Sequence, residues 1–180
     1  MQFTWAFLAA LISVAAAAPT KRQSDCPLQN LSGLTIVTSA DSGAHTRWDV
    51  FVDANELVQP GDLGWFFRKS PSANEAFVAQ VGSQSNLFTF SRKDTGAPIG
   101  VSGSQLVASS TSAATFKVTC SAGCDAFAGD NDLAADGCTF ELTDGTNGVG
   151  QCASFAATNS AVALTPCDGS LGQSSKIFGA

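Results

Sequence analysis

The chain has 180 residues, of which 44% are hydrophobic and 13% are charged, with six cysteines and no tyrosine. This length accommodates one domain with a substantial core, and the apolar fraction is too high for a disordered chain. The low charge argues against a solvated helical array, and the formal net charge of −6 argues against nucleic-acid binding, which needs clustered Lys and Arg.

The chain opens with the pattern of a secretory signal. Ala6 to Ala17 is an apolar run too short to span a bilayer, and small residues at its end suit cleavage near Ala17. Residues 18–22 end in Lys21-Arg22, which resembles the dibasic kexin-type processing site of fungal secreted proteins; a polar linker is the alternative. We predict a signal peptide over 1–17, a pro-segment over 18–22 and a single mature domain over 23–180. Removing 22 residues would leave 158 and take the formal charge to −8, because two basic residues leave and no acidic one does.

Secretion determines how the cysteines are interpreted. An even number in an oxidising compartment predicts three disulfides, with fifteen possible connectivities. Zinc binding by the Cys120 to Cys124 segment is the competing interpretation, but the only histidine, His45, lies far away in sequence. No other segment is apolar enough to cross a membrane, so we expect an extracellular or cell-wall location. The six cysteines are Cys26, Cys120, Cys124, Cys138, Cys152 and Cys167.

A glycosylation sequon follows the first cysteine. Asn30-Leu31-Ser32 has the required pattern, and in a secreted chain it predicts a glycan on Asn30.

Short strands are predicted along the whole mature chain. Runs rich in Val, Ile, Phe and Thr alternate with turn clusters of Gly, Ser, Asn and Asp, whereas helical periodicity is missing. This pattern predicts an all-β barrel or sandwich. In chain order the runs are 34–37, 48–52, 65–67, 76–81, 87–90, 115–118 and 139–142.

An internal repeat refines this prediction. Leu34, Leu87 and Phe140 begin similar segments, each 53 residues after the one before. Each start leads to a Gly-containing turn, two more apolar stretches and a closing run. The closing runs are 65–67, 116–118 and 176–178. Three such units predict a β-trefoil, in which packing around one axis closes a barrel; a Greek-key β-sandwich is the alternative.

The C-terminal unit resembles one repeat of the ricin-B-type lectin family. Its residues 150–173 contain a Cys, an apolar run, a second Cys and a Gly-Gln near the end. The resemblance implies a Cys152–Cys167 disulfide within the repeat. The layout also resembles that of small fungal secreted proteins, which include cell-wall proteins and effectors that trigger plant responses.

The unit departs from the lectin pattern where sugar contacts are expected. The family's Gln-x-Trp motif would put Trp at position 175, where Ser175 stands, and Ser154 and Phe155 occupy the region of its acidic residue. Carboxylate and amide groups hydrogen-bond sugar hydroxyls, so the candidate ligand groups are Asn159, Asp168 and Gln173. Trp65, which follows Gly64, is a candidate rim aromatic; core packing is expected for most of Trp48, Phe66 and Phe67.

Catalytic constellations are weak in this sequence. The single base candidate, His45, lies in a predicted turn, and no Gly-x-Ser-x-Gly motif is present. Asp49 and Asp53, with Glu56 nearby, could form a carboxylate pair, but they also suit the polar side of an amphipathic strand.

A calcium loop is a further weak candidate. Asp130, Asp132 and Asp136 supply oxygens, and Glu141 falls at the twelfth position, but Ala135 stands where such a loop needs Gly. A disulfide-held acidic surface loop is the alternative, and we expect no cofactor and no metal.

Taken as a whole, the sequence predicts a secreted, non-enzymatic binding protein. The expected partner is a glycan or cell-wall polysaccharide, or a host protein if the chain is an effector, elicitor or inhibitor. A small secreted hydrolase is the third alternative.

Overall fold

The computed structural model describes residues 26–39, 46–51, 57–62, 75–108, 111–125, 128–129, 132–155 and 161–180. The predicted signal peptide and pro-segment lie outside these residues. Within them, no helix is long and apolar enough to cross a membrane. The elements are η1 (Leu28–Asn30), β1 (Leu34–Thr38), β2 (Thr46–Phe51), β3 (Leu57–Asp62), β4 (Phe77–Val81), β5 (Leu87–Arg92), β6 (Gly100–Ser102), β7 (Gln105–Val107), β8 (Thr115–Thr119), β9 (Ala122–Gly123), β10 (Leu133–Thr143), β11 (Gly148–Ser154), β12 (Ala163–Pro166), η4 (Leu171–Gln173) and β13 (Ser175–Gly179).

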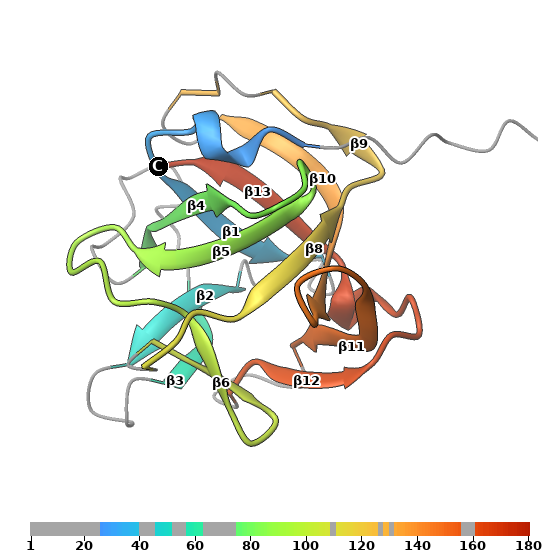
Figure 1. Cartoon of the computed structure of the whole chain (residues 1–180). Helices are drawn as coiled ribbons and strands as arrows, with labels where there is room; N and C mark the ends of the chain where they lie inside the picture. The colour runs from blue at the N-terminus through green and yellow to red at the C-terminus, as the bar shows by residue number, and fades with distance from the viewer. Residues whose placement is uncertain are drawn as a thin grey trace, which may run out of the picture.

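Six antiparallel strands form a closed barrel. They follow the order β1, β13, β10, β8, β5 and β4, and pairing of Leu34 with Phe77 joins β4 back to β1. Closure leaves no unpaired edge in this layer, which protects the strands from pairing with other chains. In Figure 1 these strands cross one another in the upper part of the molecule.

Three hairpins cover one end of the barrel. They are β2–β3, β6–β7 and β11–β12, one from each predicted unit. Strand β7 pairs with both β3 and β12, and the Val162 N–H donates to the Val58 carbonyl at 2.7 Å, which links the first and third hairpins. The hairpins therefore form a triangular cap, seen at the bottom of Figure 1.

This arrangement is an all-β, disulfide-stabilised, β-trefoil-like fold, as the repeat predicts. Each unit supplies two barrel strands and one cap hairpin. One assignment is wrong: the first unit closes with β4 at 77–81, which pairs with β1 and β5, whereas the prediction placed this strand at 65–67. A constant repeat length does not allow for the longer connection after β3. Residues 65–67 lie outside the described ranges.

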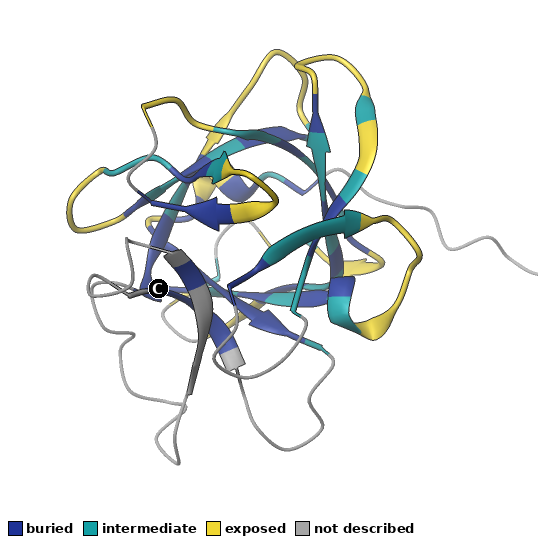
Figure 2. Ribbon diagram, turned by 90° about the horizontal axis from the view of Figure 1, so that it is seen from below, coloured by how far each residue is buried: buried dark blue, intermediate teal, exposed yellow. Residues whose placement is uncertain are grey.

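Aromatic rings fill the space between barrel and cap. Trp48 on β2 is fully buried, with its ring centroid 5.1 Å from that of Phe140 and 6.2 Å from that of Phe77. Phe90 lies 5.6 Å from Phe140 and 6.1 Å from Phe116. These rings come from all three units, so the core forms only when the units pack together. Figure 2 shows the strands largely buried and the exposed residues concentrated in the turns.

Three disulfides pair all six cysteines. They are Cys26–Cys124, Cys120–Cys138 and Cys152–Cys167. The last is the pair that the lectin-type repeat implies. Cys26–Cys124 attaches the N-terminal segment with η1 to the loop after β9, and Cys120–Cys138 joins the end of β8 to β10.

Candidate functional site

The third unit contains a turn between β12 and β13, and a buried side chain holds this turn in place. The Cys152–Cys167 disulfide joins β11 to the residue that follows β12. Gln173 comes next in the short helix η4 and is only 2% exposed. Residues Asp168 to Leu171 lie between Cys167 and Gln173, and we name them the 168–171 turn.

The side-chain amide of Gln173 forms hydrogen bonds with this turn and with the end of β12. Its Oε1 accepts hydrogen bonds from the backbone N–H groups of Asp168 (3.0 Å) and Gly169 (3.3 Å). Its Nε2 donates to Thr165 Oγ1 (2.9 Å) and to the Pro166 carbonyl (2.7 Å). The buried amide thus has its own hydrogen-bonding groups satisfied by the backbone of this turn and by Thr165. Gln173 therefore positions the turn rather than presenting its amide to a ligand.

The outer side of the turn carries groups of different chemistry. Asp168 is exposed, and its Oδ1 accepts a hydrogen bond from the Ser170 backbone N–H at 2.8 Å. Hydrogen bonds from the backbone and side chain of Ser170 lower the pKa of Asp168, so this carboxylate is ionised at neutral pH. Leu171 is 66% exposed, the most exposed of the four exposed large hydrophobic side chains of the described chain. The turn combines a fixed anion, a hydroxyl and an apolar side chain within four residues.

A close backbone approach fixes the turn against β11. The Phe155 N–H donates to the Gly172 carbonyl at 2.9 Å. A Cβ at Gly172 would lie 3.0 Å from the Phe155 carbonyl oxygen and 3.3 Å from Ser154 Oγ. Only glycine fits here without a shift of its neighbours. Ser154 and Phe155 therefore lie directly beside η4.

Several predicted residues lie outside the described ranges. These are the ligand candidates Trp65 and Asn159, the catalytic candidates His45, Asp53 and Glu56, and the calcium candidate Asp130. Of the predicted ligand groups, the structure brings Asp168 and Gln173 together in one turn.

The candidate calcium segment from Asp130 to Glu141 lies partly outside the described residues. Strand β10 begins at Leu133, so most of the segment is a strand paired with β13, β9 and β8. Asp132 Oδ2 accepts from the Gly129 N–H at 3.1 Å, and Asp136 Oδ1 accepts from the Gly137 N–H at 2.7 Å. Glu141 Oε1 accepts from the Gly150 N–H at 3.0 Å. These carboxylates therefore accept hydrogen bonds from backbone N–H groups of local turns and of the β10–β11 hairpin.

A second cluster of charged groups lies inside the fold. Trp48 and Val50 on β2 face the core, and the alternate residues Arg47 and Asp49 are buried as well, each 8% exposed. Arg47 Nε lies 2.9 Å from Glu75 Oε1, an ion pair without a directed hydrogen bond. Burial lowers the pKa of Arg47, an effect that Glu75 and Asp49 oppose. The expectation that Asp49 occupies the solvent side of an amphipathic strand is wrong.

Asp49 has an unusual proton affinity in this cluster. Burial, followed by repulsion from Glu75, raises its pKa from 3.8 to about 6, although Arg47 and Arg92 oppose the change. Arg92 pairs mainly with Asp94, donating from Nε at 3.0 Å and from Nη2 at 2.7 Å. Burial also acts on Asp94, but hydrogen bonds from Arg92 and Thr95 outweigh it and hold the pKa of Asp94 below its usual value. The pKa of Asp49 is thus raised and that of Asp94 is lowered, so the contributions of the two carboxyls to stability change with pH in opposite directions.

Asp49 makes part of the stability depend on pH. Its raised pKa means that the folded chain holds this proton more tightly than the unfolded chain. The stabilisation is complete below pH 3.8 and is lost as the pH rises through about 6. A shift of roughly two pKa units corresponds to about 3 kcal/mol. As the pH rises from about 3.5 to 7.5, the wild type should lose about 3 kcal/mol of unfolding free energy that Asp49→Asn does not lose. Urea unfolding of both proteins measures this difference. Asp94→Asn is the control and should change the pH dependence in the opposite sense; equal slopes for all three proteins would contradict the assignment.

The predicted glycosylation site is placed on the surface. Asn30 is the last residue of η1, and both Asn30 and Ser32 are exposed, whereas Leu31 between them is buried. Modification of Asn30 remains a prediction.

Comparisons with known proteins give likeness in fold. No protein-family model matches the chain, and no curated protein matches it. Among solved structures, the designed three-fold symmetric protein ThreeFoil matches with a TM-score of 0.52 at 12% identity, covering 83% of this chain and 99% of its own. The Haemophilus ducreyi cytolethal distending toxin matches with a TM-score of 0.51 at 16% identity, covering 94% of each chain. The likeness to a three-fold symmetric protein supports the division into three units.

Proposed function

We propose that the mature chain is a secreted, non-enzymatic binding protein that contacts a cell-wall carbohydrate through its 168–171 turn. The observation that carries this proposal is the turn itself. Gln173 and the Cys152–Cys167 disulfide hold it, and it presents an ionised carboxylate beside the exposed Leu171. A preorganised turn loses little conformational freedom when a ligand binds.

The chemistry of the turn suits a sugar. The carboxylate of Asp168 accepts hydrogen bonds from hydroxyl groups, and Ser170 both donates and accepts. Leu171 offers an apolar contact for the C–H groups of a sugar ring. The same unit carries the resemblance to a lectin repeat, and the β-trefoil-like fold agrees with that resemblance.

Secretion and the lack of catalysis are parts of this proposal. Three disulfides accord with an oxidising compartment. Asp49, whose pKa is raised, is buried within a group of charged residues, where burial and repulsion from Glu75 account for the raised pKa. We therefore interpret Asp49 as a structural residue rather than the acid or base of a hydrolase.

A glycan array carrying fungal and plant cell-wall oligosaccharides is the primary test. The mature chain should bind at least one class of glycan. Silence across the array, with the protein shown to be folded by circular dichroism, would contradict the carbohydrate proposal.

The contribution of Asp168 can be measured against a matched residue. Asp168→Ala should weaken binding of the strongest array ligand by about tenfold or more, because a charge-assisted hydrogen bond contributes about 1.5–3 kcal/mol. Asp144→Ala is the control, since Asp144 is also exposed and accepts hydrogen bonds from the backbone N–H groups of Thr146 and Asn147. Titration calorimetry should find its affinity unchanged; equal losses in both variants would exclude the 168–171 turn.

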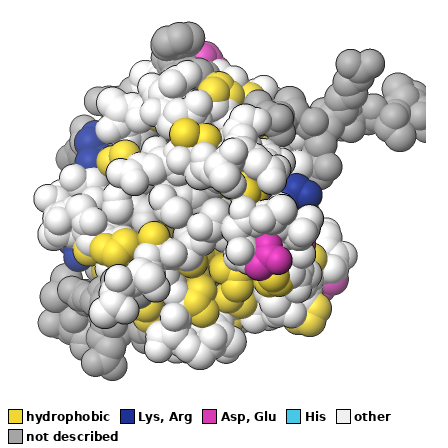
Figure 3. All heavy atoms as spheres, in the orientation of Figure 1, with side chains coloured by type: hydrophobic (Ala, Val, Ile, Leu, Met, Phe, Trp, Pro, Cys, Tyr) yellow, Lys and Arg dark blue, Asp and Glu magenta, His cyan; other side chains and the backbone are white. Residues whose placement is uncertain are grey.

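Protein binding is the second candidate, and a specific observation favours it. None of the described side chains that are exposed is aromatic, and the large exposed apolar residues are the aliphatic Val81, Leu133, Val149 and Leu171. Figure 3 shows hydrophobic side chains gathered in the lower half of one face, with an acidic side chain at the edge of this group. An effector or inhibitor would use such surfaces. Inhibition assays against a panel of secreted proteases separate this candidate from a lectin.

A further inference from the structure

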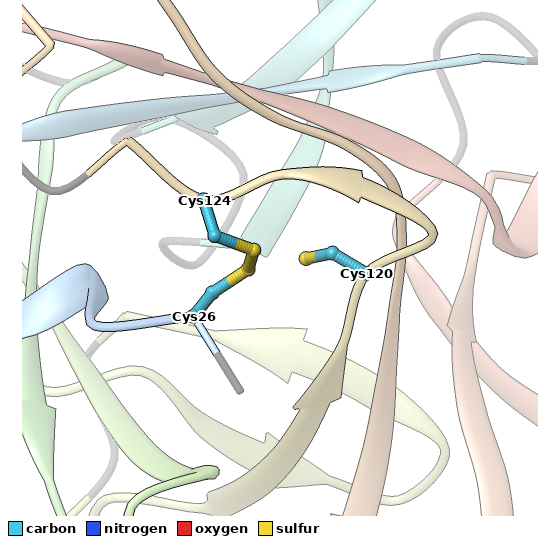
Figure 4. A group of neighbouring side chains, drawn as sticks. All are labelled: Cys26, Cys120 and Cys124. Carbon is cyan, nitrogen blue, oxygen red and sulfur yellow. A yellow bond between two sulfur atoms is a disulfide. The ribbon is translucent and has the colours of Figure 1, made fainter. Parts of the chain in front are cut away.

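Two of the three disulfides lie side by side. The sulfur atoms of Cys26, Cys120 and Cys124 are all within 4.8 Å of one another. Cys26 and Cys124 form one disulfide, and Cys120 belongs to the other, with Cys138. In Figure 4 the Cys120 side chain points toward the Cys26–Cys124 bridge. As thiols these residues could hold a metal ion, but in the oxidised protein their sulfurs are committed to disulfides.

The four cysteines differ in access. Cys26, Cys120 and Cys138 are fully buried, whereas Cys124 is partly exposed. Cys124 is thus the residue of this disulfide with solvent-exposed surface, and we expect an external thiolate to attack its sulfur, with the buried Cys26 sulfur as the leaving group. In the oxidised protein the Cys26 sulfur lies within 4.8 Å of the Cys120 sulfur, so the Cys26 thiolate is released beside it.

The backbone at Cys124 favours the same direction. Its φ is +87°, and among the described residues it is the only non-glycine with a positive φ. Side chains with a Cβ adopt this region at a cost, so the conformation persists where surrounding bonds impose it. The Cys26–Cys124 disulfide and the hydrogen bond from the Cys124 N–H to the Ala134 carbonyl at 2.6 Å both restrain this segment. Opening the disulfide removes one of the two restraints, which we expect to disfavour re-formation of the same disulfide.

We propose that these two disulfides form a thiol–disulfide exchange site for an external dithiol. A dithiol thiolate attacks Cys124 Sγ, a mixed disulfide forms, and Cys26 leaves as a thiolate. Cys26 then attacks Cys120 Sγ, the Cys26–Cys120 bond forms, and Cys138 leaves as a thiolate. The second thiol of the reductant resolves the mixed disulfide, which releases Cys124. The dithiol is oxidised by two electrons to its cyclic disulfide, and its two protons pass to Cys124 and Cys138.

The exchange changes one part of the fold and preserves another. After the exchange, Cys124 and Cys138 no longer belong to a disulfide. The segment between Cys120 and Cys138, which includes β9, is then attached by a disulfide at Cys120 alone. The N-terminal segment stays attached through Cys26, so Leu28 and Leu31 keep their places in the core. This inference rests on the placement of the sulfur atoms and is independent of carbohydrate binding.

The test uses the oxidised mature chain and limiting dithiothreitol. Samples are quenched with acid, alkylated with N-ethylmaleimide and digested with a protease that cleaves before Asp. Cys120 and Cys124 stay on one peptide, so tandem mass spectrometry assigns the label within it. In the species with two labels among Cys26, Cys120, Cys124 and Cys138, we expect labels on Cys124 and Cys138, with Cys26 linked to Cys120.

Two results would overturn the exchange site. The first is labelling of Cys26 and Cys124 with Cys120–Cys138 intact, which would show simple reduction. The second is labelling of Cys120 and Cys138 with Cys26–Cys124 intact, which would show direct attack on the buried disulfide. Cys167 is exposed, so reduction of Cys152–Cys167 is expected independently and is scored apart from these four cysteines. Because the wild-type protein is used, neither result depends on whether a cysteine variant folds.

Discussion

Replacing Cys26 and Cys124 together by alanine is expected to lower the free energy of unfolding by about 5 kcal/mol. The disulfide joins residues separated by 98 positions, and such a long closed loop restricts the unfolded chain strongly. Its loss also releases the segment that carries Leu28 and Leu31 into the core. Guanidinium chloride unfolding followed by far-ultraviolet circular dichroism measures the change.

The matched control is the short-range disulfide of the third unit. Cys152 and Cys167 are separated by 15 positions, so replacing both by alanine should cost about 3 kcal/mol. The difference between the two double variants isolates the effect of loop length. A larger loss for the Cys152 and Cys167 variant would contradict the view that the long disulfide holds the N-terminal segment in place.

The second large effect is expected at Trp48. Trp48→Ala should reduce stability by about 3–5 kcal/mol, because it removes the largest buried side chain at the meeting point of the units. The cavity would border Phe77 and Phe140, which belong to strands on different sides of the barrel. Chemical unfolding measures this loss.

Trp48→Phe is the control for ring packing. The indole Nε1 of Trp48 is buried and has no hydrogen-bond partner in the described part of the chain, so phenylalanine removes an unsatisfied donor while keeping a ring. We expect a loss of only about 1–2 kcal/mol, since relief of the unsatisfied donor offsets part of the lost contact area. Equal losses for both variants would show that the ring contacts contribute little.

The alternation of apolar runs and turn clusters predicted most of this fold. The starts at Leu34 and Leu87 coincide with the first residues of β1 and β5, and the cap strand β7 spans Gln105–Val107 as the repeat indicated. The third start, at Phe140, falls inside β10, which begins at Leu133. The earlier start of β10 could not be recognised in the sequence, because Gly137, with a φ of +62°, interrupts the strand where its pairing with β13 is irregular.

The sites were harder to predict than the strands. Asp168 and Gln173 were named as ligand groups because they lie in the unit that resembles a lectin repeat, but the hydrogen bonds by which Gln173 holds the turn could not be recognised in the sequence. The charged cluster could not, because Asp49 and Arg92 are brought together only when β2 and β5 take their places in the fold. The adjacency of Cys120 to the Cys26–Cys124 disulfide also depends on tertiary packing, since six cysteines allow fifteen pairings. The amino-acid composition therefore says little about which distant side chains meet in the folded protein.

Hydrogen–deuterium exchange with and without the strongest array ligand tests the central claim most directly. The amides of Asp168, Gly169 and Ser170 already donate to protein oxygens, so further immobilisation by a bound sugar should slow their exchange. We predict that this protection is concentrated in residues 168–171 and is lost in Asp168→Ala. Protection confined to the β2–β3 or β6–β7 hairpin, with 168–171 unchanged, would contradict a binding surface on the third unit.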